Sequence, residues 1–592
     1  VPDRDGEGTV IRFCRNGLGE PTIPGRSIRG AVRAACEIAR QTMEDAGHPT
    51  TQDGGVFSKA SWVSLWGDDT DYTGKSLLDR RLRSDDSLPI RQSALTFHAV
   101  SFPEHKDSDS GESPLPRRHG VGIDRTTGAA SDGALYEHEF LPRGTKFDIR
   151  ITAEGRDNET MGRDQSEGIP GPASSESVKK LLELIVDVLT SGAVCLGGRT
   201  GSGQGTIQVI EPKLRRTGKT TDTGALTAPA DVLDALIGED EEGTPIPLEL
   251  GGWSLEEPAR IRINWWSPTG IFVAEDDDLT KQRKEEARKK EPTANGVTEP
   301  LRDPSVPWDE AQLLIPGTSI RGALRSRASR IARTVLAAKD KLPTFTSHDL
   351  HEQIAAEPNL VRYMFGSTEY RGAVTVHDCL STKRGKRIEV THNVIDRWTG
   401  GVIDGGLFTE AVYLGTHWEP ITIDIDLRQL LNNIEAEKGP EDDGKTVGAD
   451  ETGIGSEDRE QSKPTHADYA HAAYVLLGLV LAELSAGTLP LGSRSTRGLG
   501  QVIVSSIMVR GSTWDGVAIP ERKLDGGEAL EHPGTAASSP TQDRYDAQRK
   551  LAGNVLNYLR EDIEGAPKWS KRLDDTTEKD GTESKGKEDT HE

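Results

Sequence analysis

Cysteine and aromatic residues are scarce in this chain of 592 residues, in which Phe, Trp and Tyr together make up 5%. The four cysteines are Cys14, Cys36, Cys195 and Cys379, and no two of them form a CxxC pair. This spacing argues against a zinc ribbon and does not support a disulfide framework. We therefore expect reduced, mostly buried thiols, as is usual in a cytoplasmic protein.

Long apolar runs and targeting signals are also missing. The longest run, YVLLGLVLAELSAG from Tyr474, is too short and too interrupted to predict a membrane span. The first residues of the given sequence do not have the composition of a secretory signal. We expect no membrane partner.

Positive charge is outnumbered, because 72 Lys and Arg face 96 Asp and Glu and the formal net charge is −24. Such a total argues against nucleic acid as a partner. Much of the acid, however, lies in segments almost free of apolar residues, at 439–464 and 574–592. These segments cannot bury enough surface to offset chain entropy, so we expect them to be solvated.

One short motif is written twice in the chain. IPGRSIRGAVRAA begins at residue 23, and IPGTSIRGALRSR begins at residue 315. A solvated helix face would explain one such basic segment, but its recurrence favours a surface for backbone phosphates. Spacings of three and four place the motif's arginines on one helical face: Arg26, Arg29 and Arg33, then Arg321 and Arg325.

The repeat extends beyond this motif and keeps its order. Each copy continues with an IDRxTG segment, from Ile123 and from Ile395, and then with an apolar helical stretch. Each closes with a glycine-rich loop and a strand, LGGRTGSGQGTIQVI from Leu196 and LGSRSTRGLGQVIVSSI from Leu491. Such an ordered set of matches indicates a tandem duplication.

Each copy has the predicted element order strand, turn, helix, strands, helix, glycine loop, strand. That order predicts an α+β fold of two tandem ferredoxin-like (RRM-like, split βαβ) domains, with helices on one face of an antiparallel sheet. For the first copy, the opening strand is expected before Val1. We predict a first domain at 1–212, a linker at 213–250, a second domain at 251–511 and a C-terminal extension at 512–592. Charged insertions are expected near 275–300 and 434–467.

The glycine loops do not fit a nucleotide site. GRTGSGQG lacks the GK[ST] ending of a P-loop, and it follows a helix, which reverses the dinucleotide-binding context. Glycines let the chain approach another backbone and turn its amides toward an anion. Contact with a nucleic-acid backbone is therefore favoured, and a purely structural turn remains the alternative.

The motifs IPGxSIRGAxR, IDRxTG and LGGRTGSGQG or LGSRSTRGLG resemble the RAMP superfamily of CRISPR-associated antiviral defence proteins. The likeness is closest to the backbone subunits of type III effector complexes, and it covers both halves but not the linker or the tail. It implies a fusion of two such subunits that binds crRNA and complementary target RNA beside other effector subunits. Proteins of this kind recognise the RNA backbone and the shape of the duplex, while base pairing provides the sequence specificity.

The resemblance also implies where RNA binds. In the family, the turn and the first helix bind crRNA phosphates, the glycine loop packs near the same RNA, and a thumb near IDRxTG enters the guide–target duplex. Asp124 and Asp396 of these thumbs have a simpler alternative role, which is to cap a turn or to pair with the next arginine. The matching positions are Gly25, Arg26, Ser27, Arg29, Arg33, Arg125, Gly197, Gly198, Arg199, Gly203, Gly317, Thr318, Ser319, Arg321, Arg325, Arg397, Gly492, Arg494, Arg497 and Gly498.

Active members of the family cut target RNA with an aspartate in the loop before the IPG turn, which implies a metal-dependent endoribonuclease using Mg²⁺ or Mn²⁺. Asp5 and Asp303 are the preferred candidates here, and Asp3, Glu7 and Glu299 are weaker ones. Both loops depart from the family pattern, so solvated acids without a catalytic role remain an alternative. His98 and His377 occupy equivalent strand positions, where a packed or hydrogen-bonded histidine is expected ahead of a proton shuttle.

Two other functions fit parts of the sequence. One is a guide-processing endonuclease of the same superfamily, which would have one glycine loop and a histidine near its first helix. The other is an RNA-binding module outside CRISPR, which would not need the IDRxTG segment twice. The repeated set of motifs favours the crRNA-binding backbone subunit over both.

Overall fold

The computed structural model contains two units of mixed α and β structure, each with its own buried core. It describes residues 10–67, 93–102, 115–155, 174–216, 244–251, 253, 259–274, 297–306, 310–339, 349–438, 466–511, 521–527, 530, 541–561, 563 and 566–573. The candidate acids Asp3, Asp5 and Glu7 lie outside these residues, as do most of the predicted charged insertions and the acidic end of the chain.

The second unit is built on an antiparallel sheet whose central strand is β10 (Ala259–Ser267). One edge of β10 pairs with β19 (Ile503–Arg510), and the other pairs with β18 (Ile421–Ile425) and β17 (Thr416–Trp418). The sheet then extends to strands beyond these neighbours. They are β13 (Val374–Val376), β14 (Cys379–Lys383), β12 (Leu314–Ile315) and β20 (Arg522–Asp525).

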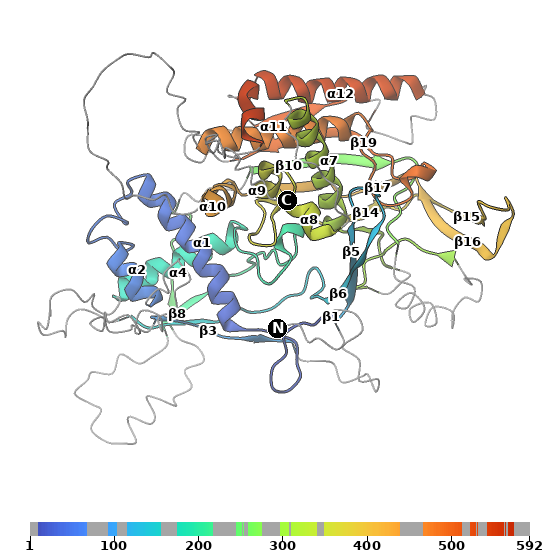
Figure 1. Ribbon diagram of the computed structural model, residues 1–592. Coiled ribbons are helices and arrows are strands. Elements are labelled where there is room, and N and C mark those ends of the chain that lie inside the picture. Colours follow the sequence, from blue (N-terminus) through green and yellow to red (C-terminus); the bar gives the residue numbers. More distant parts are fainter. Residues whose placement is uncertain are drawn as a thin grey trace, which may run out of the picture.

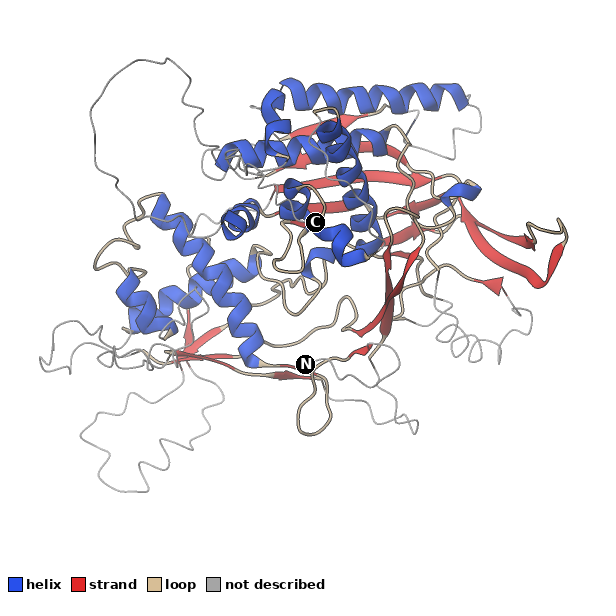
Figure 2. Cartoon of the chain, viewed as in Figure 1, coloured by secondary structure: helices blue, strands red, loops and turns tan. Residues whose placement is uncertain are grey.

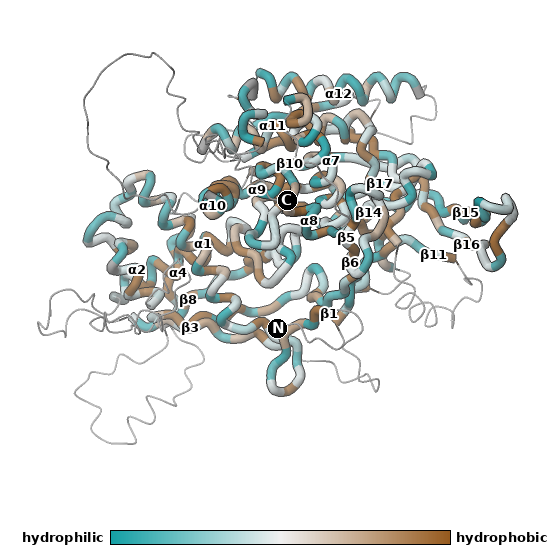
Figure 3. The backbone as a smooth tube through the Cα atoms, in the orientation of Figure 1, coloured by the Kyte–Doolittle hydropathy of each residue, from teal (hydrophilic) through white to brown (hydrophobic). Residues whose placement is uncertain are grey.

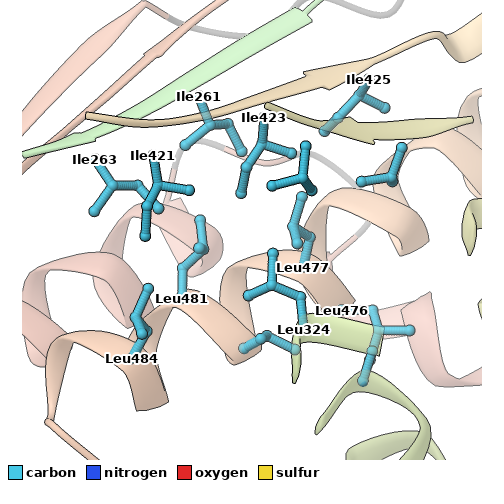
Figure 4. Packing of buried hydrophobic residues seen from close by; sticks show 14 of the residues in the cluster. Ile261, Ile263, Leu324, Ile421, Ile423, Ile425, Leu476, Leu477, Leu481 and Leu484 are labelled. Carbon is cyan, nitrogen blue, oxygen red and sulfur yellow. The ribbon is translucent and has the colours of Figure 1, made fainter. Parts of the chain in front are cut away.

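The alternating sequence of the central strands places their branched side chains on one face. Ile261 and Ile263 of β10 lie beside Ile421 and Ile423 of β18, and all four are buried (Figure 4). Leucines from the helices, including Leu481, meet this row from the other side (Figure 4). The core of the second unit is therefore a layer of helices packed on one face of the sheet (Figure 2).

Two long helices of the second unit contribute to this core. They are α7 (Gly317–Ala337) and α11 (His466–Ser485). Shorter helices and a C-terminal helix surround them (Figure 1). These are α8 (Leu350–Ala355), α9 (Asn359–Phe365), α10 (Leu427–Lys438), α12 (Thr541–Glu561), and the 3₁₀ turns η3 (Ser495–Arg497) and η5 (Ala566–Arg572).

Helix α11 is apolar on all sides, and in the part of the chain that the structure describes it alone is long and apolar enough to cross a membrane. Most of that apolar window is buried inside the protein. The sequence analysis counted the apolar run only from Tyr474 and predicted that it is too short for a membrane span. That prediction of length was wrong, because the apolar helix already begins before Tyr474. Burial on both sides explains the composition: the sheet covers one side of α11 and α12 covers the other, with Leu559 packed close to Gly478.

The C-terminal segment belongs to the second core. Leu524 of β20, Leu551 of α12 and Leu573 after η5 are all buried in the cluster that holds β10 and α11. The sequence prediction treated residues 512–592 as an extension, whereas the described residues between 521 and 573 complete the second unit. The apolar character of α11 was the signal for this extra layer.

The first unit repeats the same elements at smaller scale. Its helices are α1 (Gly25–Asp45), α2 (Lys59–Trp66) and α4 (Ser175–Thr190), followed by the turn η2 (Thr200–Ser202). Its strands pair as β2 with β4 and β3 with β7: Thr22–Ile23, Val100–Ser101, Leu95–Phe97 and Ile151–Ala153.

The strand registers align the two units residue by residue. Phe97 pairs with Ile151 in the first unit, and Val376 pairs with Ile423 in the second. Each unit also carries a hairpin next to a short parallel strand. The hairpins are β5 (Arg117–Ile123) with β6 (Ala130–Glu139), and β15 (Lys386–Ile395) with β16 (Val402–Leu414); the short strands are β1 (Val10–Ile11) and β11 (Val297–Thr298).

The core strands of the first unit form two separate two-stranded sheets, whereas those of the second form one eight-stranded sheet. Among the described residues, the first unit has no counterpart of β10, and residues 208–211, which correspond to the start of β19, do not form a strand. The alternating apolar and polar side chains at 207–210 therefore have no strand partner within the described part of the chain.

The described ends of the predicted linker lie against the first unit. Its ends pair as β8 (Leu214–Arg216) and β9 (Thr244–Ile246). Beyond β9, the amide of Gly251 donates to the carboxylate of Asp187 on α4, and the ring of Trp253 lies 5.1 Å from that of Phe57. The chain around α4 and β8 includes apolar stretches, which are brown in Figure 3. Gly251 and Trp253 thus help to close the first core.

Candidate nucleic-acid interface

The IPG turn requires glycine in both units because the first helix starts against a neighbouring strand. A Cβ on Gly25 would lie 2.0 Å from the carbonyl oxygen of Phe97, and one on Gly317 would lie 2.2 Å from that of Val376. The preceding prolines, Pro24 and Pro316, hold the extended conformation from which each helix begins. The two helix N-termini are therefore fixed on equivalent sites.

The arginine four residues after the glycine of each turn, Arg29 or Arg321, is a structural clamp. The guanidinium of Arg29 donates to the carbonyl of Trp66 and lies over its ring, and Arg321 donates to the carbonyl of Phe365 at 2.6 Å. Both carbonyls belong to the last turn of the short helix, α2 or α9, where a cation offsets the negative end of the helix dipole. Burial lowers the pKa of Arg321 to about 10.

The next arginine on each helix, Arg33 or Arg325, contacts the same short helix. Arg325 donates to Gly366 at 2.8 Å and to the carboxylate of Glu357 at 2.7 and 2.9 Å, and Arg33 lies over the ring of Trp66. Burial lowers the pKa of Arg325 to about 9. Arg321 and Arg325 therefore do not lie on an open basic face, which corrects that expectation. The arginines recur because the first helix of each unit binds the C-terminal end of a short helix, which is α2 in the first unit and α9 in the second.

The two helix N-termini differ in their nearest acceptor. The amide of Gly317 donates to a carboxylate oxygen of Asp378 at 2.7 Å. In the first unit, the strand registers put Ala99 at the position of Asp378, and alanine supplies no side-chain acceptor. The predicted phosphate site at Gly317, Thr318 and Ser319 thus already holds an anion from its own chain, whereas none of the described residues supplies one at Gly25, Arg26 and Ser27.

The glycine-rich loops share an unusual backbone. Arg199 has φ 58° and Arg494 has φ 64°, and among the described residues they are the only non-glycine residues with positive φ. A side chain in this conformation costs about 1 kcal/mol or more. Because the two arginines occupy equivalent loop positions, the strained turn is a feature that both repeats share.

The two strained arginines meet different partners. Arg199 lies over the ring of Tyr136 at 4.1 Å, next to the buried His138. Arg494 forms two hydrogen bonds, at 2.7 and 2.9 Å, with Glu410, which occupies the position of His138 in the second hairpin. Burial and the charges of Arg199 and Arg118 lower the pKa of His138 to about 4.

The aspartate of each IDRxTG segment caps the hairpin turn. Asp124 accepts from the amide of Thr126 at 2.7 Å, and Asp396 accepts from the amide of Trp398 at 2.8 Å. The backbone bond from Trp398 lowers the pKa of Asp396. Turn capping, one of the two simple roles expected for these residues, is therefore the one observed.

The arginine of each IDRxTG segment has a different environment in the two hairpins. Arg125 forms an ion pair with Glu357 of the second unit, and burial lowers its pKa to about 10. Arg397 is exposed, and its hairpin projects away from the second unit (Figure 1). The first hairpin is docked, whereas the second extends from the body of the protein.

The first glycine loop packs against the second unit. A Cβ on Gly203 would lie 2.8 Å from the Cα of His377, and one on Gly201 would lie 3.3 Å from the guanidinium of Arg321. Close by, Arg118 pairs with Asp378 at 2.8 Å. This loop therefore contacts the start of α7, which makes it part of the junction between the two units.

The second-unit candidates for catalysis are engaged elsewhere. Asp303 accepts from the amide and hydroxyl of Ser305, at 3.0 and 2.7 Å, and so caps its own turn. Glu299 is buried and pairs with Arg387 at 2.7 Å and Arg302 at 3.4 Å. No group of three or more His, Cys, Asp or Glu suited to a metal ion occurs in the described part of the chain. These residues do not fit the Mg²⁺ or Mn²⁺ site that the resemblance implied.

The paired histidines are hydrogen-bonded, as expected. His98 lies 2.6 Å from the hydroxyl of Thr152, and His377 lies 2.7 Å from the carboxylate of Asp424. Although burial raises the pKa of Asp424, hydrogen bonds from His377 and Arg260 outweigh that effect and lower it. The pair holds β13 to β18 beside the first glycine loop.

Both glycine loops and both turns keep some of the predicted residues accessible. Half-buried residues are Gly25, Arg29, Arg33, Arg125, Arg199, Gly203, Thr318, Ser319, Arg321, Arg325 and Arg494, and Gly317 is buried. The exposed ones are Arg26, Ser27, Gly197, Gly198, Arg397, Gly492, Arg497 and Gly498.

A comparison with protein families matches the RAMP superfamily model to residues 4–208 and again to 313–503. The chain belongs to the RAMP superfamily. The match covers part of each unit, includes both IPG turns and both glycine loops, and assigns the chain to a family of CRISPR-associated RNA-binding proteins. A comparison with curated proteins gives no match.

The RAMP motifs did not reveal the residues that join the two units. Asp378, Glu357, Gln353 and Arg118 carry some of these contacts, Arg143 with Glu419 and Arg428 with Asp45 carry others, and none was singled out from the sequence. Aligning the two repeats would have shown that acids are present in the second unit only, because Asp378 and Glu357 align with Ala99 and Ser58 of the first.

Proposed function

We propose that this RAMP protein is a backbone subunit of a type III CRISPR effector complex, in which its two units occupy successive positions along one crRNA. The main support is the internal repetition. Two helix starts and two strained arginine loops recur in one chain, in an order that matches the RAMP family twice. A repeated binding unit suits a ligand that is itself a repeating chain of phosphates.

We also propose that each unit is ferredoxin-like. In the second unit, the strand order β19, β10, β18, β13 and the crossings by α7 and α11 support this assignment. Because the helices cover one face and the glycine loop meets the first helix at one end, the RNA would run along that end of the sheets. Bases would remain available for pairing with target RNA.

The contacts in the proposal are weighted toward the first unit. Arg26 and Ser27 are exposed beside a helix N-terminus that lacks the acid found at Asp378. Arg497 and the glycines around it are exposed on the second loop. These groups would hold phosphates, while Arg29 and Arg321 hold the fold beneath them.

Cleavage of target RNA remains a proposal for the first unit alone, through Asp5 in the loop before its IPG turn. The second unit is proposed as a holder of RNA, because Asp303 and Glu299 are bonded within their own loop and its neighbours.

Sequencing the RNA that co-purifies with the full chain from its host tests the proposal. Guides carrying a shared repeat-derived end would support it, whereas a heterogeneous set of cellular RNAs would refute it. A uniform precursor cut at one position by the isolated chain would instead indicate a guide-processing nuclease.

Two matched variants sharpen this test. The double variant Arg26→Ala with Arg497→Ala should weaken RNA binding at moderate salt by about tenfold or more, since phosphate contacts dominate affinity. Arg560→Ala, which removes an exposed charge from α12, should leave binding unchanged. Equal losses in both would show that total charge, rather than the repeated sites, governs binding.

A further inference from the structure

The first unit has two strand edges that pair with no strand in the described part of the chain. One is the edge of β7 that faces away from β3, and the other is the backbone of residues 208–211. In the second unit, the equivalents of these two edges belong to β18 and β19, and they flank the central strand β10. Unpaired N–H and C=O groups along such edges can bind an added strand.

The apolar side chains beside these edges are less buried than their counterparts in the second unit. Ile151 and Val209 are half-buried, whereas Ile423 and Val504 at the same positions are 0% exposed. The strand registers align the first pair, and the closing bonds of the two glycine loops align the second. In the second unit β10 completes the burial, since its Ile261 lies opposite Ile423 (Figure 4).

An apolar groove lies where the edge at 208–211 continues into β8. It has a volume of about 360 Å³, and its lining includes Pro212, Leu214 and Ile246. At the positions of Pro212 and Leu214 the second unit has Ile507 and Val509, which pair with β10 and are buried. The groove therefore exposes apolar groups of a kind that β10 and the helices cover in the second unit.

Strand β10 shows what kind of segment fits between two such edges. It is nine residues long, and its branched side chains Ile261 and Ile263 are buried in the core. The alternate residues Arg260 and Arg262 lie on the other face and are half-buried and exposed. Because β10 runs antiparallel to both neighbours, the first unit fits an extended segment with apolar side chains at alternate positions.

The path of the chain indicates where such a segment is attached. After β10, the chain passes the second glycine loop, where Phe272 bridges to Ser493, and then reaches β11. In the first unit, β1 stands at the position of β11, so the matching strand would lead into β1. Residues 1–9, VPDRDGEGT, do not have the alternating branched side chains of such a strand.

We infer that the first unit is a strand acceptor, and that it holds a segment of the same polypeptide that lies ahead of Val1. The added strand pairs with residues 208–211 on one side and with β7 on the other. Its apolar side chains cover Ile151 and Val209, and its polar ones face away from the helices. This pairing is independent of RNA binding.

A synthetic peptide tests whether the first unit accepts a strand. The probe is a fluorescein-labelled copy of residues 258–268, PARIRINWWSP, added to the 592-residue chain and followed by fluorescence anisotropy. The second unit already holds its own β10, so only the first has edges for the probe. The control peptide has the same residues in an order without alternation. We expect saturable binding at least about tenfold tighter than that of the control, and equal binding of the two peptides would overturn the inference.

Two neighbouring substitutions locate the bound peptide. Val209 packs against the first core, whereas Ile210 is 70% exposed on the other side of the segment. Val209→Lys should weaken peptide binding by about tenfold or more, and Ile210→Lys should leave it unchanged. Hydrogen exchange of the unsubstituted chain gives the same location without a variant. Amides of residues 149–153 and 208–211 should gain protection with the peptide, and protection that appears only elsewhere would contradict the proposed site.

Mass spectrometry of the protein purified from its host tests the source of the strand. We expect peptides that continue ahead of Val1 and contain a run of alternating branched apolar residues. This host protein should bind the probe at least about tenfold more weakly than the 592-residue chain, because its own strand fills the site. A host protein that begins at Val1, or one that binds the probe as tightly as the 592-residue chain, would overturn the inference.

Discussion

The two RAMP units share their motifs but differ in what surrounds them. In the second unit, Asp378 and Glu357 neutralise the start of α7 and the arginines beside it, and the first unit packs on that surface. In the first unit, Ala99 and Ser58 leave the matching surface without acids. One fold has thus been adapted to two positions, and the start of its first helix is covered by a neighbouring unit in the second position.

The largest expected effect is on the acid at the centre of the junction. Glu357→Ala removes a buried carboxylate that pairs with both Arg125 and Arg325, so two buried cations lose their partner. We expect a loss of about 3 kcal/mol in the free energy of unfolding, measured by chemical denaturation. The matched change in the first unit, Ser58→Ala, removes a helix cap and should cost about 1 kcal/mol. Equal costs would mean that Glu357 does not join the units.

The glycine loops offer a closely matched pair of variants. Gly203→Ala and Gly498→Ala both place a side chain at positive φ, 75° and 88°, but only the first puts its Cβ against His377. We expect about 1 kcal/mol for Gly498→Ala and about 3 kcal/mol for Gly203→Ala. Thermal unfolding followed by tryptophan fluorescence would show the difference, and similar shifts would argue that the first loop is not packed as described.

Acid should weaken the first unit through His138. Its pKa is about 4 in the folded chain, below the ordinary 6.5, so protons bind the unfolded state more tightly. This contribution is fully present above about pH 6.5 and is lost as the pH falls toward 4. Between pH 7 and pH 5 the expected loss is about 1 kcal/mol after allowing for solvent screening. His138→Gln should flatten the pH dependence of unfolding, and an unchanged profile would rule out this assignment.

The smallest expected effect concerns cleavage by the second unit. Asp303→Ala should leave the cutting of complementary RNA by the assembled complex unchanged, because the carboxylate of Asp303 caps its own turn. Asp5→Ala is the comparison, and we expect it to remove a cut. Denaturing gels of end-labelled target RNA with Mg²⁺ or Mn²⁺ would resolve the products, and loss of a fragment with Asp303→Ala would reverse the assignment.

Most of the fold could be predicted from order and periodicity. The duplicated motifs gave the family and the two-unit organisation, and apolar spacing on α1 and alternation on β10 marked the elements. The use of each arginine could not be predicted in this way. Arg26 and Arg29 look alike in the sequence, but one is exposed and the other contacts Trp66, since that contact depends on where α2 ends.

The contacts between the units were also beyond the sequence pattern. Asp378 and Glu357 are single acids in segments that no motif marks, and their partners lie more than two hundred residues away. The C-terminal cover was missed for a different reason. Helix α11 is apolar on all sides, which indicated that a second layer covers it. The helix that supplies this layer, α12, was not predicted because the sequence around it is acidic and rich in glycine.

The position of α12 has a consequence for how the protein is made. The first unit has every described part of its core once residue 253 has been synthesised, so it can fold while the ribosome is still producing the second. Helix α11 is then made with an apolar back that stays uncovered until α12 has followed it. A nascent chain stalled between the two would expose that surface to chaperones or to other chains. The acidic segment from residue 439 comes just ahead of α11 in the sequence, and its charge would oppose aggregation during this interval.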